Sequence, residues 1–570
     1  MIPSSRQTIS PGAIHAEYTT QLSRTGKIDL VGQIISRNAD VFKRPRAADR
    51  KVILNRLGWL DAIRKMPGEL MRMERLVENV RSAGACHLFV LGMGGSSLGP
   101  EVFGNIFGRR PWLKSYTIID STAPSQLDAI LKKTDLAKSF FIVSSKSGTT
   151  IETVSQFRYF FRRIKAIRPL KAGSHFAAIT DPGSELMRIA RRNRFRELFL
   201  NPPEIGGRYS ALSFFGLVPA AFTRANLATL LRHAEQYLTY LDGHGKESDA
   251  LELGVLIGCG ARQGYDKLTF RASPKTAPFI PWIEQLVAES TGKELKGIIP
   301  IEGEPADMPT AASDDRLYLH YSFRRERRPA PSPMRSGARR PPLAVIELPD
   351  AHALGAEMVK WEMATAVAAI VLGVNPFDEP NVAESKKNTA VYIQESRKRH
   401  PRLAPPPLLT CGDCDIMTVS DVRGADKIGD LPPVEVFARF LAGLRRGDYL
   451  AILSYTEMAP EIEALLTRLR EEIQKKTKIA TLRGYGPRFL HSIGQLYKGG
   501  KPCGHFIVLE REYENDYDIP KMNLSFARLI KAQAQGDIRA LQKRRRPVIV
   551  VNLKTNPVRG LNRLLDLIVQ

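Results

Sequence analysis

Short apolar runs that alternate with stretches of helical periodicity are the feature that most restricts the fold of this chain. Four such runs occupy 87–91, 116–120, 140–143 and 176–180, and helix-like segments separate them. Strands that alternate with helices build parallel sheets covered by helices on both faces. We therefore expect an α/β fold with mainly parallel sheets, in which ligands bind beyond the carboxyl ends of the strands.

Apolar runs of the same kind recur in the second and third parts of the chain. We expect strands at 267–273, 297–301, 317–323 and 343–348, and then near 449–455, 478–481, 505–509 and 548–553. With 570 residues the chain has room for several domains. The predicted parts are an N-terminal arm at 1–50 that wraps another part of the fold or another subunit, α/β domains at 51–244 and 245–396, a Pro-rich linker at 397–432, and a C-terminal α/β lobe at 433–570.

The net charge and the cysteine content limit which cellular compartment and which binding partners we expect for this protein. A formal net charge of +25 attracts small anions as well as polyanions. We expect no nucleic-acid binding at the basic loop 324–342, because no aromatic stacking positions lie among its arginines. The five cysteines and the absence of an apolar leader predict a cytoplasmic location. The apolar run at 366–374 is too short to cross a membrane and predicts a buried helix.

A polar loop between the third apolar run and the next helix is the first candidate site. Its sequence from Ser144 to Thr150 is SSKSGTT, and a helix-like segment begins at Ile151. Hydroxyl groups at a helix start suit an oxyanion such as a phosphate monoester, because the free N–H groups there carry partial positive charge. The Walker pattern of nucleotide triphosphate sites is absent. The alternative is a cluster of helix-capping hydroxyls that binds no ligand.

Four further segments could carry chemistry. They are Gly206–Ser210, Trp282–Lys293, Asn375–Lys387 and Gly484–Gly500. In the first, glycines permit close approach of a ligand and Arg208 offers a planar cationic fork. Taken singly, each segment also has an ordinary structural interpretation: Arg208 as a cap, Glu289 and Lys386 as surface charges, and His491 as a structural histidine. Cys411 and Cys414 form a single CxxC pair, which is half of a zinc site, so we expect no metal there.

Taken together, the motifs resemble the glucose-6-phosphate isomerase family, whose members are built from two sugar-isomerase (SIS) domains. Gly92–Gly99 resembles the family's GxGGSxLG loop, and Ser145–Thr153, with the sequence SKSGTTIET, resembles its sugar-phosphate loop. The other matching segments are GGRYS at 206–210, the helix ending in ESxGK at 285–293, and NPFDxPxVxxxKxN at 375–388. The resemblance implies two three-layer αβα domains of SIS type.

The C-terminal lobe carries a resemblance of its own. Its segment YGPRFLHSxGQLxKGG, at 485–500, is similar to the C-terminal region of the isomerase half of bacterial bifunctional transaldolase/glucose-6-phosphate isomerases. We expect no transaldolase domain within this sequence, since its first 50 residues cannot house a barrel with a Schiff-base lysine.

The resemblance implies a role for each matching residue. Glu289 corresponds to the base that moves a proton between C1 and C2, and Arg208 to the group that stabilises the enediolate. Lys386 corresponds to a lysine associated with ring opening. His491 is the candidate ring-opening histidine, although it follows Lys386 in the chain whereas the family's histidine precedes it; His320 is the alternative. The implied substrate-binding residues are Gly95, Ser96, Ser145, Lys146, Ser147, Thr150 and Gln285.

The expected function follows from these roles. The resemblance implies an aldose–ketose isomerase that interconverts glucose 6-phosphate and fructose 6-phosphate through a cis-enediol, without metal or organic cofactor. Its expected partners are a sugar phosphate and, as in relatives, a second copy of the chain in a homodimer. Two alternatives stay open: a dual enzyme that also accepts mannose 6-phosphate, and a non-catalytic sugar-phosphate-binding SIS protein.

Overall fold

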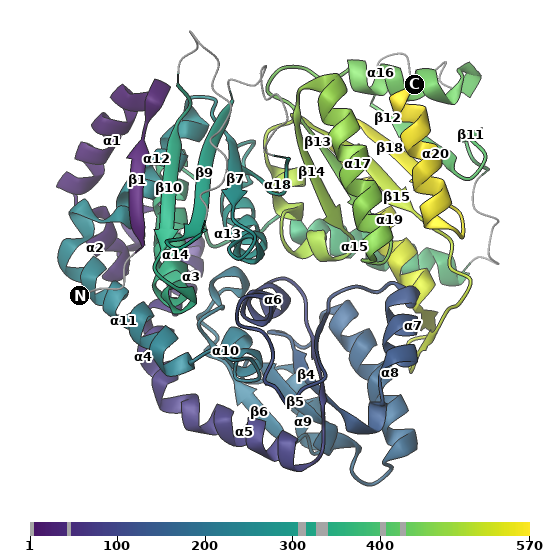
Figure 1. Cartoon of the computed structure of the whole chain (residues 1–570), viewed down its shortest axis with the longest axis horizontal. Helices are drawn as coiled ribbons and strands as arrows, with labels where there is room; N and C mark the ends of the chain where they lie inside the picture. The colour runs from purple at the N-terminus through teal and green to yellow at the C-terminus, as the bar shows by residue number, and fades with distance from the viewer. Residues whose placement is uncertain (1–4, 43–46, 306–314, 327–339, 399–405, 422–428) are drawn as a thin grey trace.

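The computed structural model describes residues 5–42, 47–305, 315–326, 340–398, 406–421 and 429–570. Three separate sheets, each flanked by helices, form the three lobes seen in Figure 1. The first lobe is mainly blue, the second is teal with purple N-terminal elements, and the third is green to yellow. This arrangement confirms the predicted α/β class.

The first sheet consists of five parallel strands in the order β3-β2-β4-β5-β6. Every residue of the central strands β2 and β4 is buried, as expected for strands covered on both faces. The four apolar runs predicted for this part of the chain are confirmed as strands, and each predicted end lies within one residue of the observed end. The bounds are β2 His87–Leu91, β3 Ser115–Ile119, β4 Ser139–Ser144, β5 Phe176–Thr180 and β6 Glu197–Leu200.

Helices of the first lobe cover both faces of this sheet. The helix after the polar loop, α8, begins at Ile151 as predicted and packs its aromatic stripe into the core through Phe157 and Phe160. Helix α10 begins at Phe214, and Ser213 caps its first turn. The helices of this lobe are α3 Ala47–Leu54, α4 Trp59–Lys65, α5 Leu70–Ser82, α6 Gly95–Phe107, α7 Pro124–Lys133, α8 Ile151–Ile167, α9 Glu185–Arg192 and α10 Phe214–Ala220.

The second sheet contains four parallel strands and one antiparallel edge strand, in the order β8-β7-β9-β10-β1. The edge strand comes from the N-terminal segment, which therefore wraps another part of the fold as expected. β8 begins only at Ile299, because Glu294 and Leu295 adopt left-handed turn conformations just before it. The strands are β1 Arg6–Ser10, β7 Lys267–Ala272, β8 Ile299–Ile301, β9 Arg316–Phe323 and β10 Leu343–Leu348.

Helix α14 is the central helix of the second lobe, and nearly all of its residues are buried. It contains most of the apolar run at 366–374, so that run is a buried helix as predicted. No helix among the described residues is both long and apolar enough to cross a membrane. Most of the basic loop expected at 324–342 lies outside the described residues. The helices are α1 His15–Lys27, α2 Leu30–Ile35, α11 Leu227–His244, α12 Asp249–Arg262, α13 Ile280–Thr291, α14 Leu354–Leu372 and α15 Val382–Lys398.

The third sheet has the order β14-β13-β15-β18-β12-β11, with its first four strands parallel. Residues 409–420, which we expected in a linker, instead form β11 and β12 at its antiparallel edge. The strand expected at 478–481 begins only at Ala480, because Lys478 ends the preceding helix with a φ of 59°. The strands are β11 Leu409–Thr410, β12 Asp415–Ser420, β13 Tyr449–Ser454, β14 Ala480–Tyr485, β15 Gly504–Glu510 and β18 Val548–Asn552.

The C-terminal lobe docks onto both other lobes. Its helices are α16 Pro433–Ala442, α17 Pro460–Thr477, α18 Gly494–Gly499, α19 Phe526–Lys543 and α20 Pro557–Val569. The short helix α18 packs on α13, and α19 packs along α15 (Figure 1). Before α18, Arg488 forms ion pairs with Glu101 and Asp120 of the first lobe. These contacts hold the turn at Arg488–His491 against the first two lobes.

Candidate active site

Two segments of the first lobe and one of the C-terminal lobe meet at the carboxyl end of β2, where glycines make the contact possible. A Cβ atom on Gly95 would lie 1.9 Å from the carbonyl oxygen of Gly207. Gly94 has a φ of 56°, and a Cβ atom there would lie 2.7 Å from the carbonyl oxygen of His491. The predicted GxGGSxLG loop, the GGRYS segment and the C-terminal lobe are therefore in direct contact, and Ser96 lies in the first turn of α6, which begins at Gly95.

The loop that follows β4 is organised by its own hydroxyl groups. Ser145 accepts a hydrogen bond from the N–H of Gly148 at 3.1 Å and donates one to Thr150 at 3.2 Å. Ser147 and Thr149 form a second hydroxyl pair at 2.8 Å. Thr150 occupies the N-cap position of α8, yet its side chain caps no N–H group of the helix. This geometry favours the anion-binding interpretation over the capping one, because the helix start stays available to a ligand.

Lys146 differs from the other residues of this loop. Its ammonium lies 2.6 Å from the carboxylate of Asp181 and donates a hydrogen bond of 2.8 Å to the carbonyl of Pro203. Burial raises the pKa of the Asp181 carboxyl, and the Lys146 ammonium opposes that rise. The lysine therefore anchors the loop to the end of β5, and its charge is already paired.

Arg208 and Glu289 form the buried centre of the candidate site. The Arg208 guanidinium lies 3.1 Å from Glu289 Oε1, and the side chains are 4% and 12% exposed. Arg208 also donates to Ser290 Oγ at 2.9 Å. Burial raises the pKa of the Glu289 carboxyl, although Arg208 pulls it in the opposite direction. A carboxylate with a raised pKa beside a fixed cation is suited to take a proton from a carbon acid while the cation stabilises the resulting oxyanion.

The segment that follows α14 completes the surroundings of Arg208. Glu379 pairs with the guanidinium at 3.1 Å, and the carbonyl of Pro376 accepts a hydrogen bond from it at 2.5 Å. Lys293, buried at 2% exposure, donates to Asp378 Oδ1 at 2.7 Å. Burial lowers the pKa of Lys293 to about 8, with the charge of Arg208 acting in the same direction. The segment that contains the NPFD turn is thus bound by both Arg208 and Lys293. Lys386 lies in α15, and its side chain is outside the described residues.

Gln285 links the candidate base to the C-terminal lobe. It lies one helical turn before Glu289 in α13, and its Nε2 donates to Glu289 Oε2 at 3.2 Å. The same amide donates to the carbonyl oxygen of His491 at 2.8 Å. A substitution at Gln285 would therefore disturb the orientation of both groups.

His491 contacts the residue Glu152, which follows the hydroxyl loop at 145–150. The sequence did not indicate this contact. The imidazole Nε2 of His491 lies 3.0 Å from Glu152 Oε1, in the first turn of α8. The same oxygen accepts a hydrogen bond of 2.7 Å from Gln533 in α19, and Gln533 Oε1 accepts one of 2.6 Å from Thr122. Because an ionised carboxylate only accepts hydrogen bonds, this arrangement places the imidazole proton on Nε2 and leaves Nδ1 as the free acceptor.

The alternative histidine is a sheet residue. His320 lies within β9, in register with Arg271 of β7 and Val345 of β10. Burial lowers the pKa of His320 to about 4, with Arg271 adding to the effect. The geometry therefore favours His491 over His320 as the histidine of the site. Within the described ranges, no cluster of three or more His, Cys, Asp or Glu residues is arranged to hold a metal.

Sequence reasoning missed three contributors. Glu152 lies within the SKSGTTIET segment, but the motif assigns it no role of its own. Glu379 occupies a variable position of the NPFDxPxVxxxKxN segment and likewise has no assigned role. Nothing in the sequence indicated Gln533. It lies far from Glu152 along the chain, and the two side chains meet only because α19 docks there.

Residues 47–310, less than half of the chain, match the family model described as phosphoglucose isomerase. This part of the chain is therefore similar to that family.

Individual relatives agree with this placement. The chain is 26% identical over 383 residues to a glucose-6-phosphate isomerase of Lactobacillus helveticus, covering 58% of this chain and 85% of the relative. It is 31% identical over 210 residues to the enzyme of Campylobacter jejuni, covering 36% of this chain and 50% of the relative. The chain thus spans about half the length of the Campylobacter relative.

Among solved structures, a glucose-6-phosphate isomerase from Chlamydia trachomatis superposes with a TM-score of 0.57 at 18% identity, covering 70% of this chain and 90% of that one. This likeness shows a shared fold. The resemblance of the C-terminal lobe to bifunctional transaldolase/isomerases is not tested by these comparisons and stays a prediction.

Proposed function

We propose that this chain is a glucose-6-phosphate isomerase that interconverts glucose 6-phosphate and fructose 6-phosphate in the cytoplasm through a cis-enediol intermediate. The observation that carries the proposal is the buried Glu289–Arg208 pair, with 3.1 Å between the guanidinium and Oε1. It provides a base and an oxyanion-stabilising cation within one enclosed contact. A non-catalytic binding protein would have no use for this pair, so the geometry favours the enzyme.

The residues divide the work along the substrate. The hydroxyl loop at 145–150 and the start of α8 bind the phosphate, with Gly95 and Ser96 beside them. His491 accepts the proton of the anomeric hydroxyl at Nδ1 and passes it to the ring oxygen as the ring C–O bond breaks, with Lys386 assigned to the same step by resemblance. Glu289 then transfers a proton between C2 and C1, while Arg208 stabilises the negative charge of the enediolate. Binding energy from the phosphate fixes C1 and C2 within reach of the base.

A coupled assay tests the proposal directly. Fructose 6-phosphate is supplied with EDTA, and formation of glucose 6-phosphate is followed for the wild type and for Glu289→Gln. We expect activity in the wild type and a loss of at least about 1,000-fold in the variant, because the amide cannot accept the proton. An inactive wild type or an active variant would contradict the proposal.

Two finer points use the same preparation. Mannose 6-phosphate in the same assay format decides whether the enzyme is dual. We also propose a homodimer, on the basis of the resemblance to dimeric relatives, and light scattering of the full chain tests it. A mass equal to that of a single chain would contradict the dimer.

A further inference from the structure

The third sheet repeats the strand order of the first. In the first sheet, β4 and β5 follow β2 on one side while β3 lies on the other. In the third sheet, β15 and β18 follow β13 on one side while β14 lies on the other, again all parallel. In such sheets the ligand lies beyond the carboxyl ends of the strands, where the order reverses. For the third sheet that point lies between β13 and β15.

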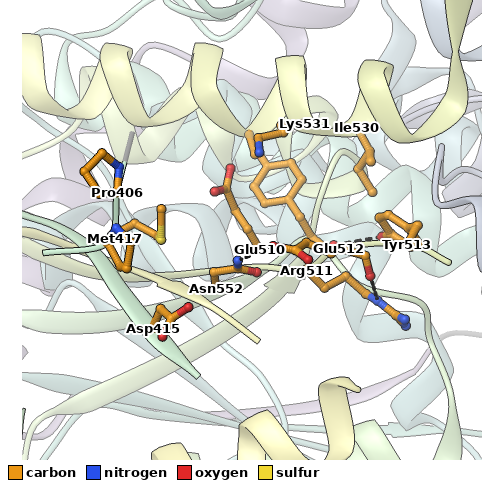
Figure 2. A pocket seen from close by; sticks show the side chains of 13 residues that line it. Pro406, Asp415, Met417, Glu510, Arg511, Glu512, Tyr513, Ile530, Lys531 and Asn552 are labelled. Atoms are coloured by element: carbon orange, nitrogen blue, oxygen red, sulfur yellow. Dashed lines mark hydrogen bonds between the residues drawn. The ribbon is translucent and has the colours of Figure 1, made fainter. Parts of the chain in front are cut away.

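A cavity of about 180 Å³ lies at this point (Figure 2). Its wall is formed by the residues at the ends of three parallel strands: Tyr455 after β13, Glu510 at the end of β15, and Asn552 at the end of β18. Helix α19 contributes Ile530 and Lys531 to the wall (Figure 2). In the first sheet, the corresponding strand ends carry the glycine loop, the hydroxyl loop and Asp181. The cavity is therefore the positional counterpart of the candidate active site.

The chemistry of the cavity differs from that of the first site. Where the first lobe has a hydroxyl loop at a helix start, this cavity has Glu510, Glu512 and Asp415. The guanidinium of Arg511 is neutralised by Glu457, with Nη1 at 2.6 and 2.8 Å from its two oxygens. The surplus of carboxylates disfavours a phosphate or any other anion.

Several polar groups at the cavity have unused hydrogen-bonding capacity. The hydroxyl of Tyr455 is buried and has no hydrogen-bond partner among the described residues. The Oδ1 atom of Asp415 is likewise buried without a hydrogen bond, although the ammonium of Lys554 is 3.4 Å away. Glu510 uses Oε1 to accept a bond of 2.9 Å from Gln535, and burial raises the pKa of its carboxyl. Buried polar groups in native proteins normally have partners.

We propose that the C-terminal lobe contains a second small-molecule site, at the carboxyl ends of β13, β15 and β18, which takes an uncharged polyhydroxylated compound such as a sugar or sugar alcohol without phosphate. Tyr455, Asp415 and Glu510 supply hydrogen-bonding groups for the ligand's hydroxyls, and Met417 and Ile530 supply an apolar wall for its carbon chain. The volume corresponds to about six water molecules at 30 Å³ each, which limits the ligand to a single sugar unit.

D-Glucitol is the probe, and saturation-transfer NMR on the full chain measures its binding. We expect binding by the wild type and an affinity about fivefold weaker in Tyr455→Phe, which removes a single hydroxyl and its hydrogen bond. Tyr159→Phe is the matched control: Tyr159 is also buried with an unpartnered hydroxyl, but it lies in the first lobe, and the affinity should not change.

A further variant tests the location of the glucitol site, and a second probe tests the charge of its ligand. Ser145→Ala should bind glucitol as the wild type does, whereas a loss there would place the binding in the first lobe and overturn the proposal. Absence of glucitol binding by the wild type, or equal affinity in Tyr455→Phe, would also overturn it. Binding of 1,4-diaminobutane in place of glucitol, with sensitivity to Tyr455→Phe, would show a cation site and contradict the neutral ligand.

Discussion

His491 of the C-terminal lobe and Glu152 of the first lobe are held together by a contact of 3.0 Å between Nε2 and Oε1. The pair joins a histidine far along the chain to the first turn of the helix that starts at the phosphate loop. Both side chains are largely buried, at 12% and 5% exposure. The C-terminal lobe is therefore part of the candidate active site, because the histidine enters it only when that lobe is docked.

Glu152→Gln should lower kcat by about 100-fold. The amide keeps the size of the side chain but removes the negative charge that fixes the imidazole tautomer. Steady-state kinetics with fructose 6-phosphate measure the effect. Glu185→Gln is the control, since Glu185 lies exposed in the first turn of α9 and pairs only locally with Arg188. Equal kcat values for the two variants would show that Glu152 does not act through His491.

Gln533→Leu should lower kcat by about tenfold, a smaller loss than that of Glu152→Gln, because it removes one charge-assisted hydrogen bond and leaves the carboxylate in place. Gln533→Glu should be worse than leucine at neutral pH, since a second carboxylate would face Glu152. Gln542→Leu on the same helix, whose amide contacts Ser420, is the matched control and should retain wild-type kcat. If the glutamate variant were the more active one, the positioning role would be wrong.

The pH dependence of kcat/KM should report Glu289. The base works only when deprotonated, so activity rises with pH through its pKa, and burial puts the midpoint of this acid limb above the ordinary value of 4.5. Arg208 opposes the rise, so Arg208→Gln should move the limb to higher pH while kcat falls about 100-fold. Arg208→Lys keeps the charge and should leave the limb nearer its wild-type position. A limb that moves to lower pH in Arg208→Gln would contradict the assignment.

The hydroxyl loop should affect binding more than chemistry. Ser145→Ala removes the hydroxyl that bonds to both Gly148 and Thr150, and we expect KM to rise about tenfold with kcat changed less than threefold. Gly148→Ala should be more damaging, because Gly148 has a φ of 71° and a Cβ atom would lie 2.3 Å from the backbone nitrogen of Leu186. A fall in kcat at unchanged KM for Ser145→Ala would mean that the loop takes part in the chemical step.

Much of the fold could be predicted from the sequence because buried strands are short apolar runs. The runs at 87–91, 176–180 and 343–348 have the bounds of β2, β5 and β10. The ends that shifted were set by local backbone geometry, such as the left-handed Lys478, which no periodicity reveals. The strands β11 and β12 escaped prediction because the proline residues around 406 hid two short edge strands.

The candidate site was predictable where one motif carries its own geometry, as in Ser145–Thr150 or the placement of Glu289 on α13. Contacts between lobes were not. Gln533 and Glu152 are far apart in sequence, and only the packing of α19 brings their side chains within 2.7 Å. The pairing of Lys146 with Asp181 was equally unpredictable from one motif. The motif alone assigned the Lys146 ammonium to the phosphate, whereas in the structure this charge is paired with Asp181.

Deuterium incorporation tests the central claim that Glu289 transfers a proton through an enediol. Glucose 6-phosphate is converted in D₂O by the wild type and by Glu289→Gln, and NMR follows the label at C2 of the recovered aldose and at C1 of the ketose. We predict incorporation at both carbons with the wild type and none with the variant. Product that forms without any label, or label that appears at the wild-type rate in Glu289→Gln, would contradict the account.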